Sequence, residues 1–437
     1  MTCQSRMPLT VLDEVFVHAD DPAQPLTVQI EARVVGALDS VRLRAAVRAA
    51  LNKHPLARAR LAPWTKDAGS HQWMIDAEPQ IEPVRVANIG DGTDLDEVRA
   101  EFYSTPLSLF ESPPFRIRHV QDPDGDWVMI SIHHSASDGM GALRLLQSIC
   151  REYAGANDPT PDFDAAEARQ LALQDTRPTL AKWLQTGRME LERLTRFGSL
   201  PARLTPQDET TEPGYGVKTL MLPLGPVLSA PLRAATGATV NDVLVAAASR
   251  AAGRWIEEHG KDADRVSVFM PISARPAEWS REIVANLVVG DIVSTTTTNR
   301  ASAKQCLFAV AGWTDAVKKR GPGPALAALS KIRPFDVAGR RAVTRFVMHS
   351  GARLADTLIL SNLGLVPDDF VGGDSLQLTE VYFSPPSAMP CGLGLGAVAL
   401  RDSLFLSLRY RRALWSGAAA DHFSGILRDE LDQLAER

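Results

Sequence analysis

The 437-residue sequence has only four cysteines, few lysines and no long hydrophobic run. The cysteines are too widely spaced for a metal site and too few for a disulfide framework in a chain of this size, so we expect reduced thiols and no bound metal. Because no run of 18 apolar residues is present, we expect no transmembrane segment. The N-terminus reaches Asp13 and Glu14 before an apolar core could form, so we expect no signal peptide. These absences predict a cytoplasmic protein.

The charge composition is close to balanced. The 47 basic and 52 acidic residues give a formal net charge of −5 and a pI near 6.0, which gives no reason to expect nucleic-acid binding. Only nine of the basic residues are lysines, an arginine bias that we attribute to a GC-rich bacterial genome. The hydrophobic share of 45% and the charged share of 23% are typical of globular proteins and exclude wholesale disorder.

Strand-like and helix-like segments alternate along most of the chain, which predicts an α/β protein. We expect strands near 26–36, 72–86, 115–121, 127–133, 217–224, 265–271, 287–295, 356–361, 376–384, 393–400 and 403–410. We expect helices near 39–53, 94–104, 138–154, 179–197, 240–259, 301–319, 337–350 and 417–435. Residues 155–178 are rich in proline and aspartate and are the best linker candidate. We therefore expect an N-terminal lobe of residues 1–170 and a C-terminal lobe of residues 171–437.

The segment WVMISIHHSASDGM carries the best candidates for chemistry. A strand is expected to end near Ile132, where His133 and His134 follow, and Asp138 and Gly139 open a helix after a short turn. A side chain at such a turn projects into the cleft beyond the strand, where α/β proteins usually place their sites. Histidine suits proton transfer near neutral pH. Successive strand residues point to opposite faces, so only one histidine of the pair can serve a given cleft.

Two simpler interpretations apply to the same residues. Asp138 before Gly139 is also an ordinary helix N-cap, which needs no catalytic role. His134 and Asp138 are both metal-ligand types, but the spacing suggests no third ligand, so we do not expect a metal site.

Residues 133–139, HHSASDG, resemble the HHxxxDG signature of the CoA-dependent acyltransferase superfamily, which includes chloramphenicol acetyltransferase, nonribosomal peptide condensation domains and wax-ester synthase–diacylglycerol acyltransferases. Weaker resemblances support this one. Residues 8–16 are similar to the P-L-S-x-L-D-x-x-F opening of the wax-ester branch, and residues 54–61 to the H-E-x-L-R-T-R-F stretch of condensation domains. The remaining similarities to the wax-ester branch are Pro114-Phe115, Val240-Asn241-Asp242-Val243, and Ser361-Asn362, after which residues 363–365 depart from its pattern.

The resemblance implies an α/β (α+β) fold of two chloramphenicol-acetyltransferase-like lobes that form a V with a tunnel at their interface. It also implies transfer of an acyl group from a phosphopantetheine thioester to a small-molecule alcohol or amine. The donor would be acyl-CoA or an acyl carrier protein, acting as a co-substrate, and no cofactor would be permanently bound. We favour acyl-CoA because no carrier domain is fused in this chain.

The resemblance also assigns roles to individual residues. His134 would be the general base that deprotonates the acceptor, although the sequence does not separate this from a positioning or charge-stabilising role. Asp138 would pair with Arg58 and hold the turn, while His133 and Gly139 would be structural. Candidates for the tunnel or the lobe interface are Asn241, Asp242, Ser361 and Asn362, with an ordinary helix start as the alternative for the first two.

A basic stretch lies between residues 318 and 345, where eight lysines and arginines are opposed only by Asp336. Arg340 and Arg341 are candidate ligands for the donor's phosphates or for an acidic carrier protein, and a solvated helical face is the alternative. Two other functions stay open: a stand-alone condensation enzyme fed by carrier proteins in natural-product biosynthesis, and a non-catalytic docking member of the superfamily. We expect a monomer that binds no nucleic acid.

Overall fold

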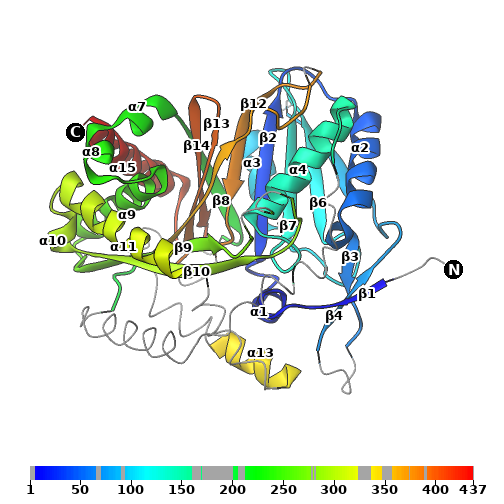
Figure 1. Cartoon of the computed structure of the whole chain (residues 1–437), viewed down its shortest axis with the longest axis horizontal. Coiled ribbons are helices and arrows are strands. Elements are labelled where there is room, and N and C mark those ends of the chain that lie inside the picture. The colour runs from blue at the N-terminus through cyan, green and yellow to red at the C-terminus, as the bar shows by residue number, and fades with distance from the viewer. Residues whose placement is uncertain are drawn as a thin grey trace.

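The computed structural model describes residues 5–64, 70–89, 94–159, 169, 200–204, 212–276, 279, 282–322, 336–346, 357–373, 375–387 and 391–436. Two large sheets stand side by side with helices packed against them, and a small third sheet lies near the N-terminus (Figure 1). This architecture confirms the predicted mixed α/β class with two lobes.

The first lobe is built on a five-stranded sheet in the order β12-β2-β7-β6-β5. Its strands are β2 (Thr27–Val34), β5 (Val84–Asn88), β6 (Phe115–Gln121), β7 (Trp127–His133) and β12 (Leu378–Ser384). Neighbouring strands are antiparallel except for the parallel pair β5 and β6. Helices α2 (Ser40–Lys53) and α4 (Gly139–Ala154) pack together against this sheet, and α3 (Leu95–Ser104) lies against β8 of the second lobe (Figure 1).

The second lobe is built on a six-stranded sheet in the order β10-β9-β11-β13-β14-β8. Its strands are β8 (Tyr215–Pro223), β9 (Arg265–Ser273), β10 (Val288–Thr296), β11 (Leu358–Val366), β13 (Leu393–Leu400) and β14 (Ser403–Arg411). The helices of this lobe are α7 (Leu224–Ser229), α8 (Pro231–Thr236), α9 (Val240–Glu258), α10 (Thr297–Arg300), α11 (Ala303–Arg320) and α15 (Gly417–Glu436). Helix α9 is buried along most of its length because α11 and α15 both pack on it.

A third, small sheet of β1 (Ser5–Pro8), β4 (Gln72–Ile75) and β3 (Ala59–Leu61) borders the first lobe, with the short 3-10 helix η1 (Pro55–Arg58) leading into β3. Helix α1 (Val11–Ala19) follows β1 and packs against α13 (Val337–Phe346), a helix from the second half of the chain (Figure 1). Thr10 starts α1 with a capping box, since its hydroxyl accepts from Asp13 N–H and the Asp13 carboxylate accepts from Thr10 N–H.

The chain crosses between the lobes more than once. Strand β12 comes from the second half of the sequence but pairs with β2 at the edge of the first sheet. The boundary that we predicted after residue 170 lies outside the described residues, and because of β12 a single cut of the chain does not separate the two sheets. The helix predicted near 179–197 also lies outside the described residues.

The lobes share a buried interface that explains why both faces of β2 are buried. One large core contains residues of β2 and β7 together with residues of the second half, including Leu363 and Phe405. Polar groups of β2 at this interface have partners. Arg99 Nε lies 2.9 Å from Glu31 Oε1, and Arg409 Nη1 donates to the Thr27 carbonyl at 2.8 Å. Burial of these charges is therefore matched by partners.

None of the described helices combines the length and the apolar composition needed to cross a membrane.

Candidate active site

The HHSASDG segment forms the turn between the end of β7 and the start of α4, beside elements of the second half of the chain. Glycine is required at position 139, because a Cβ there would lie 2.7 Å from Leu363 Cδ2 and 2.8 Å from Phe383 Cε2. Strands β11 and β12 therefore approach the first turn of α4 closely. The turn is placed where both lobes meet.

Asp138 is the most strongly held residue of the turn. Its buried carboxylate accepts two hydrogen bonds from Arg275, Nη1 to Oδ2 at 2.6 Å and Nη2 to Oδ1 at 2.8 Å. It also caps α4 through Gly141 N–H at 3.0 Å and accepts from Leu287 N–H at 2.8 Å. Burial raises the pKa of Asp138, but Arg275 and the two N–H donors outweigh burial and hold the pKa below its ordinary value.

The predicted pairing of Asp138 with Arg58 is wrong. Arg58 ends η1, and its Nη1 donates to the backbone carbonyl of Ala77, just after β4, at 2.7 Å. The partner of Asp138 is Arg275, which lies 137 residues further along the chain. Motif spacing within the first lobe contains no information about a residue that only the fold brings to the turn.

Arg275 lies on the segment between β9 and β10, which reaches from the second lobe to the first. Its Nη2 also donates to the carbonyl of Ala285 at 2.8 Å, and the same carbonyl accepts from Asp138 N–H at 3.2 Å. The buried side chains of Ile283, Ala285 and Leu287 join the core beside the small sheet. The ion pair therefore ties the turn to a segment of the second lobe, which sequence reasoning missed.

The two histidines of the turn have different surroundings. His133 is buried, with Nδ1 2.7 Å from Ser135 Oγ and Nε2 3.4 Å from the Asp20 carboxylate. The side chain of His134 has no hydrogen bond or ion pair to any other described residue. Its backbone N–H donates to the Leu26 carbonyl at 2.9 Å, which fixes the residue at the end of the strand.

The ring of His134 lies parallel to the ring of Phe16 on α1, with 3.8 Å between the centroids and 5° between the planes. Only 7% of His134 is exposed, and Nδ1 is enclosed, which leaves Nε2 as the ring nitrogen that is not enclosed. Burial lowers the pKa of His134 to about 4, although a hydrogen bond with its own backbone and the charge of Asp138 act in the opposite direction. At neutral pH the ring is therefore an uncharged imidazole that can accept a proton.

The described residues contain no group of three or more His, Cys, Asp or Glu side chains that could hold a metal. The chemistry that this arrangement offers is that of a neutral base at the boundary of two lobes.

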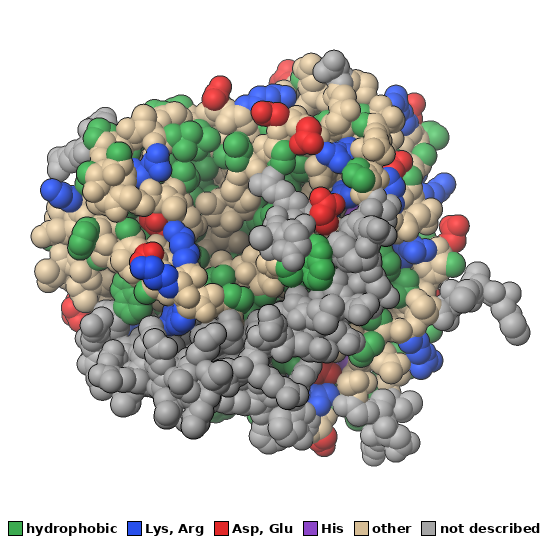
Figure 2. Space-filling view, in the orientation of Figure 1, with side chains coloured by type: hydrophobic (Ala, Val, Ile, Leu, Met, Phe, Trp, Pro, Cys, Tyr) green, Lys and Arg blue, Asp and Glu red, His purple; other side chains and the backbone are tan. Residues whose placement is uncertain are grey.

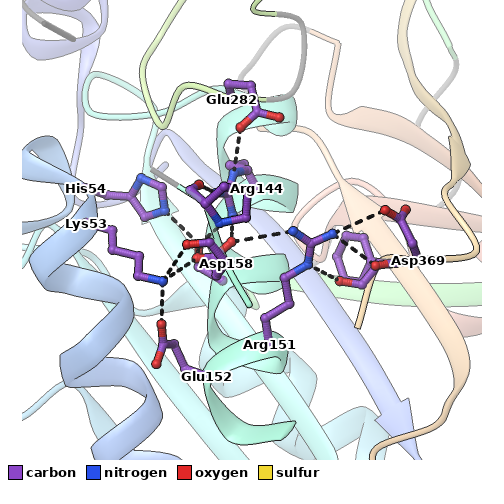
Figure 3. A network of polar contacts seen from close by, with 11 residues as sticks. Lys53, His54, Arg144, Arg151, Glu152, Asp158, Glu282 and Asp369 are labelled. Carbon is purple, nitrogen blue, oxygen red and sulfur yellow. Dashed lines mark hydrogen bonds and ion pairs between the residues drawn. The ribbon is translucent and has the colours of Figure 1, made fainter. Parts of the chain in front are cut away.

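A second polar cluster holds α4 itself (Figure 3). Asp158 follows α4 with a fully buried carboxylate, which lies 3.0 Å from Arg144 Nη1 and 3.3 Å from Lys53 Nζ. Arg144 also approaches Glu282 of the β9–β10 segment at 3.8 Å, and Arg151 donates to the carbonyl of Phe370 after β11 at 3.1 Å. Segments from both lobes are thus fastened to α4, from Arg144 near its start to Arg151 near its end.

The other predicted interface residues have mainly local roles. Asp242 completes the capping box of α9 with Thr239, so the helix-start alternative describes it well. Asn241 donates to Met270 Sδ at 3.0 Å. Ser361 and Asn362 lie on β11, next to Leu363, which contacts the region of Gly139. The β11 pair therefore adjoins a residue that lies against the turn.

Most of the predicted basic stretch is already paired. Arg340 is buried, and its Nε lies 2.7 Å from Glu14, so the fold uses it to join α13 to α1 and does not present it at the surface as a ligand for donor phosphates. Lys319 pairs with Asp315 at 2.7 Å. Arg341 is exposed. Lys331 and Arg333 lie outside the described residues, and on the face in Figure 2 basic and acidic side chains are intermixed around a recess.

The sequence matches a known protein family and two related proteins along most of its length. The family model described as Condensation domain matches residues 19–303. The uncharacterized protein Rv2305 of Mycobacterium tuberculosis (strain ATCC 25618 / H37Rv) is 34% identical over 434 residues, which cover 97% of this chain and 98% of that protein. The uncharacterized protein MT2362 of strain CDC 1551 / Oshkosh gives the same values.

Solved structures share the fold at low identity. The first condensation domain of the calcium-dependent antibiotic synthetase, in complex with a substrate analogue, matches with a TM-score of 0.71 at 15% identity, covering 99% of this chain and 96% of that chain. A mutant starter condensation domain of rhizomide synthetase, in complex with C8-CoA and Leu-SNAC, matches with a TM-score of 0.67 at 16% identity, covering 98% and 94%. The predicted two-lobed acyltransferase-like fold is confirmed, while the V shape and the tunnel stay predictions.

Proposed function

The chain belongs to the Condensation domain family, and from that premise we propose that it is an acyltransferase that uses His134 as a general base. The donor is a phosphopantetheine thioester, with acyl-CoA favoured, and the acceptor is a hydroxyl or an amine. Family membership supports acyl transfer as the class of reaction, and the environment of His134 supports the role of this residue.

The reaction needs little beyond positioning and one proton acceptor. A thioester is already activated, so the acceptor attacks the carbonyl carbon while His134 Nε2 takes its proton. The new C–O or C–N bond forms as the C–S bond breaks, and the imidazolium then returns the proton to the departing thiolate. Such proton transfer contributes typically about 10²–10⁴-fold, so holding donor and acceptor together must contribute much of the rest.

The observation that carries the proposal is the state of the His134 ring. It is neutral at physiological pH, its Nδ1 is enclosed, and no described side chain occupies its Nε2. Asp138 is saturated by Arg275 and two N–H donors, so it fixes the turn and has no capacity left for proton transfer. A histidine ring without a partner at Nε2 is available to a bound acceptor.

A solved condensation domain and one exposed arginine support the donor assignment. A condensation domain of the same fold has been solved with C8-CoA, which supports a CoA-type donor here. Arg341 is exposed on α13 and stays a candidate contact for the donor's phosphates or for an acidic carrier protein, whereas the paired Arg340 does not.

The test is a thioester-turnover assay with a panel of alcohol and amine acceptors. We expect His134→Ala to reduce turnover by about 10²–10⁴-fold, while His422→Ala, which changes an exposed histidine on α15, serves as the matched control and leaves turnover unchanged. Retention of activity within tenfold by His134→Ala would contradict the general-base role. Comparing acyl-CoA, an acyl-pantetheine without the nucleotide and a carrier-bound acyl group separates the CoA donor from the carrier alternative.

A further inference from the structure

Phe16 occupies an unusual place for a large aromatic residue. It is only partly buried and belongs to none of the hydrophobic cores formed by the described residues. Its closest ring partner is His134, at 3.8 Å and almost parallel. A phenylalanine that contributes little to a core but covers the proposed base calls for an explanation other than packing.

The helix that carries Phe16 is fixed from several directions. Asp13 closes the capping box and also accepts from Trp73 Nε1 at 3.3 Å and from Arg169. Glu14 binds Arg340 of α13. These anchors hold α1 at the edge of the first lobe, so Phe16 is presented to His134 by a rigid element.

We propose that Phe16 is a positioning residue for His134: it fixes the plane of the imidazole, excludes water from one ring face and leaves Nε2 as the edge that meets the acceptor. This inference rests on the proposed function of His134. Because one face is covered and Nδ1 is enclosed, the acceptor approaches in the plane of the ring, along the lone pair of Nε2. Such an approach is the geometry that proton transfer requires.

The stack is part of the burial that lowers the pKa of His134, because an apolar ring against the imidazole removes water that would stabilise the charged form. Other charged and titratable groups on the surrounding elements are Asp138 and His133 on the turn, Arg275 on the β9–β10 segment, Asp20 after α1, and Asp13, Glu14 and His18 on α1. The carboxylates among them are paired with Arg275, His133, Arg169 and Arg340. Replacing Phe16 therefore changes the hydration of His134 without breaking an ion pair.

The experiment compares Phe16→Ala with Phe16→Tyr and with Leu12→Ala. Leu12 is a buried residue of the same helix that packs near Ala274 and Val289, so its replacement is the matched control for loss of helix packing. The titration of His134 is followed by NMR, with its signal assigned from its absence in His134→Ala. We expect the pKa of His134 to rise from about 4 toward the ordinary 6.5 in Phe16→Ala and to stay low in the other two variants.

The kinetic readout is the acidic limb of the kcat/KM profile. In Phe16→Ala we expect kcat to fall by roughly tenfold to a hundredfold and the limb to move to higher pH, so the loss grows as the pH is lowered. Phe16→Tyr retains the stack, so its kcat and the position of its acidic limb should stay close to those of the wild type. An unchanged His134 titration in Phe16→Ala, or an equal shift in Leu12→Ala, overturns the inference. Because the NMR titration needs no turnover, it gives a result even if His134 proves not to be the base.

Discussion

The two ends of the HHSASDG turn are built in opposite ways. At the Asp138 end, the carboxylate is held by a guanidinium from the other lobe and by two backbone N–H groups. At the His134 end, four residues earlier, the side chain has an aromatic stack and no polar partner among the described residues. The Asp138 end is rigidly held, whereas at the other end Nε2 of His134 has no partner among the described residues.

This difference in surroundings suits Asp138 and His134 to different roles. A buried group that binds four donors can hold the backbone but cannot exchange a proton easily, since its charge is locked by its partners. A buried imidazole without polar partners is costly to the fold, and on the proposed function the acceptor completes the hydrogen bonds of His134. On the proposed function, the same turn therefore combines a rigidly held carboxylate with a base whose Nε2 is open to the acceptor.

Removing the ion pair between Asp138 and Arg275 has the largest expected effect on stability. Loss of one partner of a buried ion pair costs roughly 3–5 kcal/mol, because the other charge stays buried and unpaired. We expect Asp138→Ala and Arg275→Ala each to lower the free energy of unfolding by that amount, measured by urea denaturation. The double variant should lose less than the sum of the two, because the two residues interact directly.

Arg58→Ala is the matched control for this cycle, because Arg58 donates to the Ala77 carbonyl and forms no ion pair with a carboxylate of the described residues. We expect a loss well under that of Arg275→Ala, additive with Asp138→Ala. Coupling between Asp138 and Arg58 instead of Arg275 would break the comparison between the two ends of the turn.

The pH dependence of stability distinguishes the two ends by their order of titration. Since the folded-state pKa of His134, about 4, lies below the ordinary 6.5, the unfolded chain binds a proton first as the pH falls. As the pH falls from 6.5 to 4, the free energy of unfolding of the wild type should therefore decrease relative to that of His134→Ala, by at most about 3 kcal/mol. The pKa of Asp138 is lowered below 3.8, so its contribution is present above that value and is lost only in stronger acid. A difference that is constant from pH 7 to 4 would show that His134 is not held neutral.

The smallest expected effect concerns the close packing around Gly141 in the first turn of α4. A Cβ at Gly141 would lie 2.2 Å from Ser137 Oγ and 3.0 Å from the backbone nitrogen of Ala285, so Gly141→Ala should lower the free energy of unfolding by about 1–3 kcal/mol through overpacking, measured by urea denaturation. Gly312→Ala on α11 is the control, because its Cβ would meet nothing within 4 Å. It should stabilise the protein slightly, through helix propensity. A stable Gly141→Ala variant would mean that the turn has room to adjust.

Much of the fold was predictable because its signals are local. The β7–α4 unit was predicted within a residue, since a buried apolar strand, a short turn and an N-cap aspartate follow one another directly. Helix α1 was not predicted as a helix, although its Thr10 capping box is readable in the sequence. The short strands β1 and β3 were also missed, since three or four residues carry too little pattern.

The site was predictable only in part, because its partners are non-local. The motif located His134 and Asp138, whereas Arg275 reaches the turn only through the path of the β9–β10 segment. Phe16 was part of the resembling segment 8–16, but nothing in the spacing shows that its ring stacks on His134. Arg340 shows the opposite error, in which a local cluster of basic residues suggested a surface role for a side chain that the fold buries.

The path of β12 has a consequence for how the protein is made. Strand β2 pairs with β12 on the side away from β7, and β12 ends about 250 residues after β7. At roughly 5–20 residues per second, the ribosome needs on the order of 12–50 s to deliver it. During that time the nascent first lobe has an unpaired sheet edge, which is a template for association with other chains. Its sheet is completed only when most of the chain has been translated.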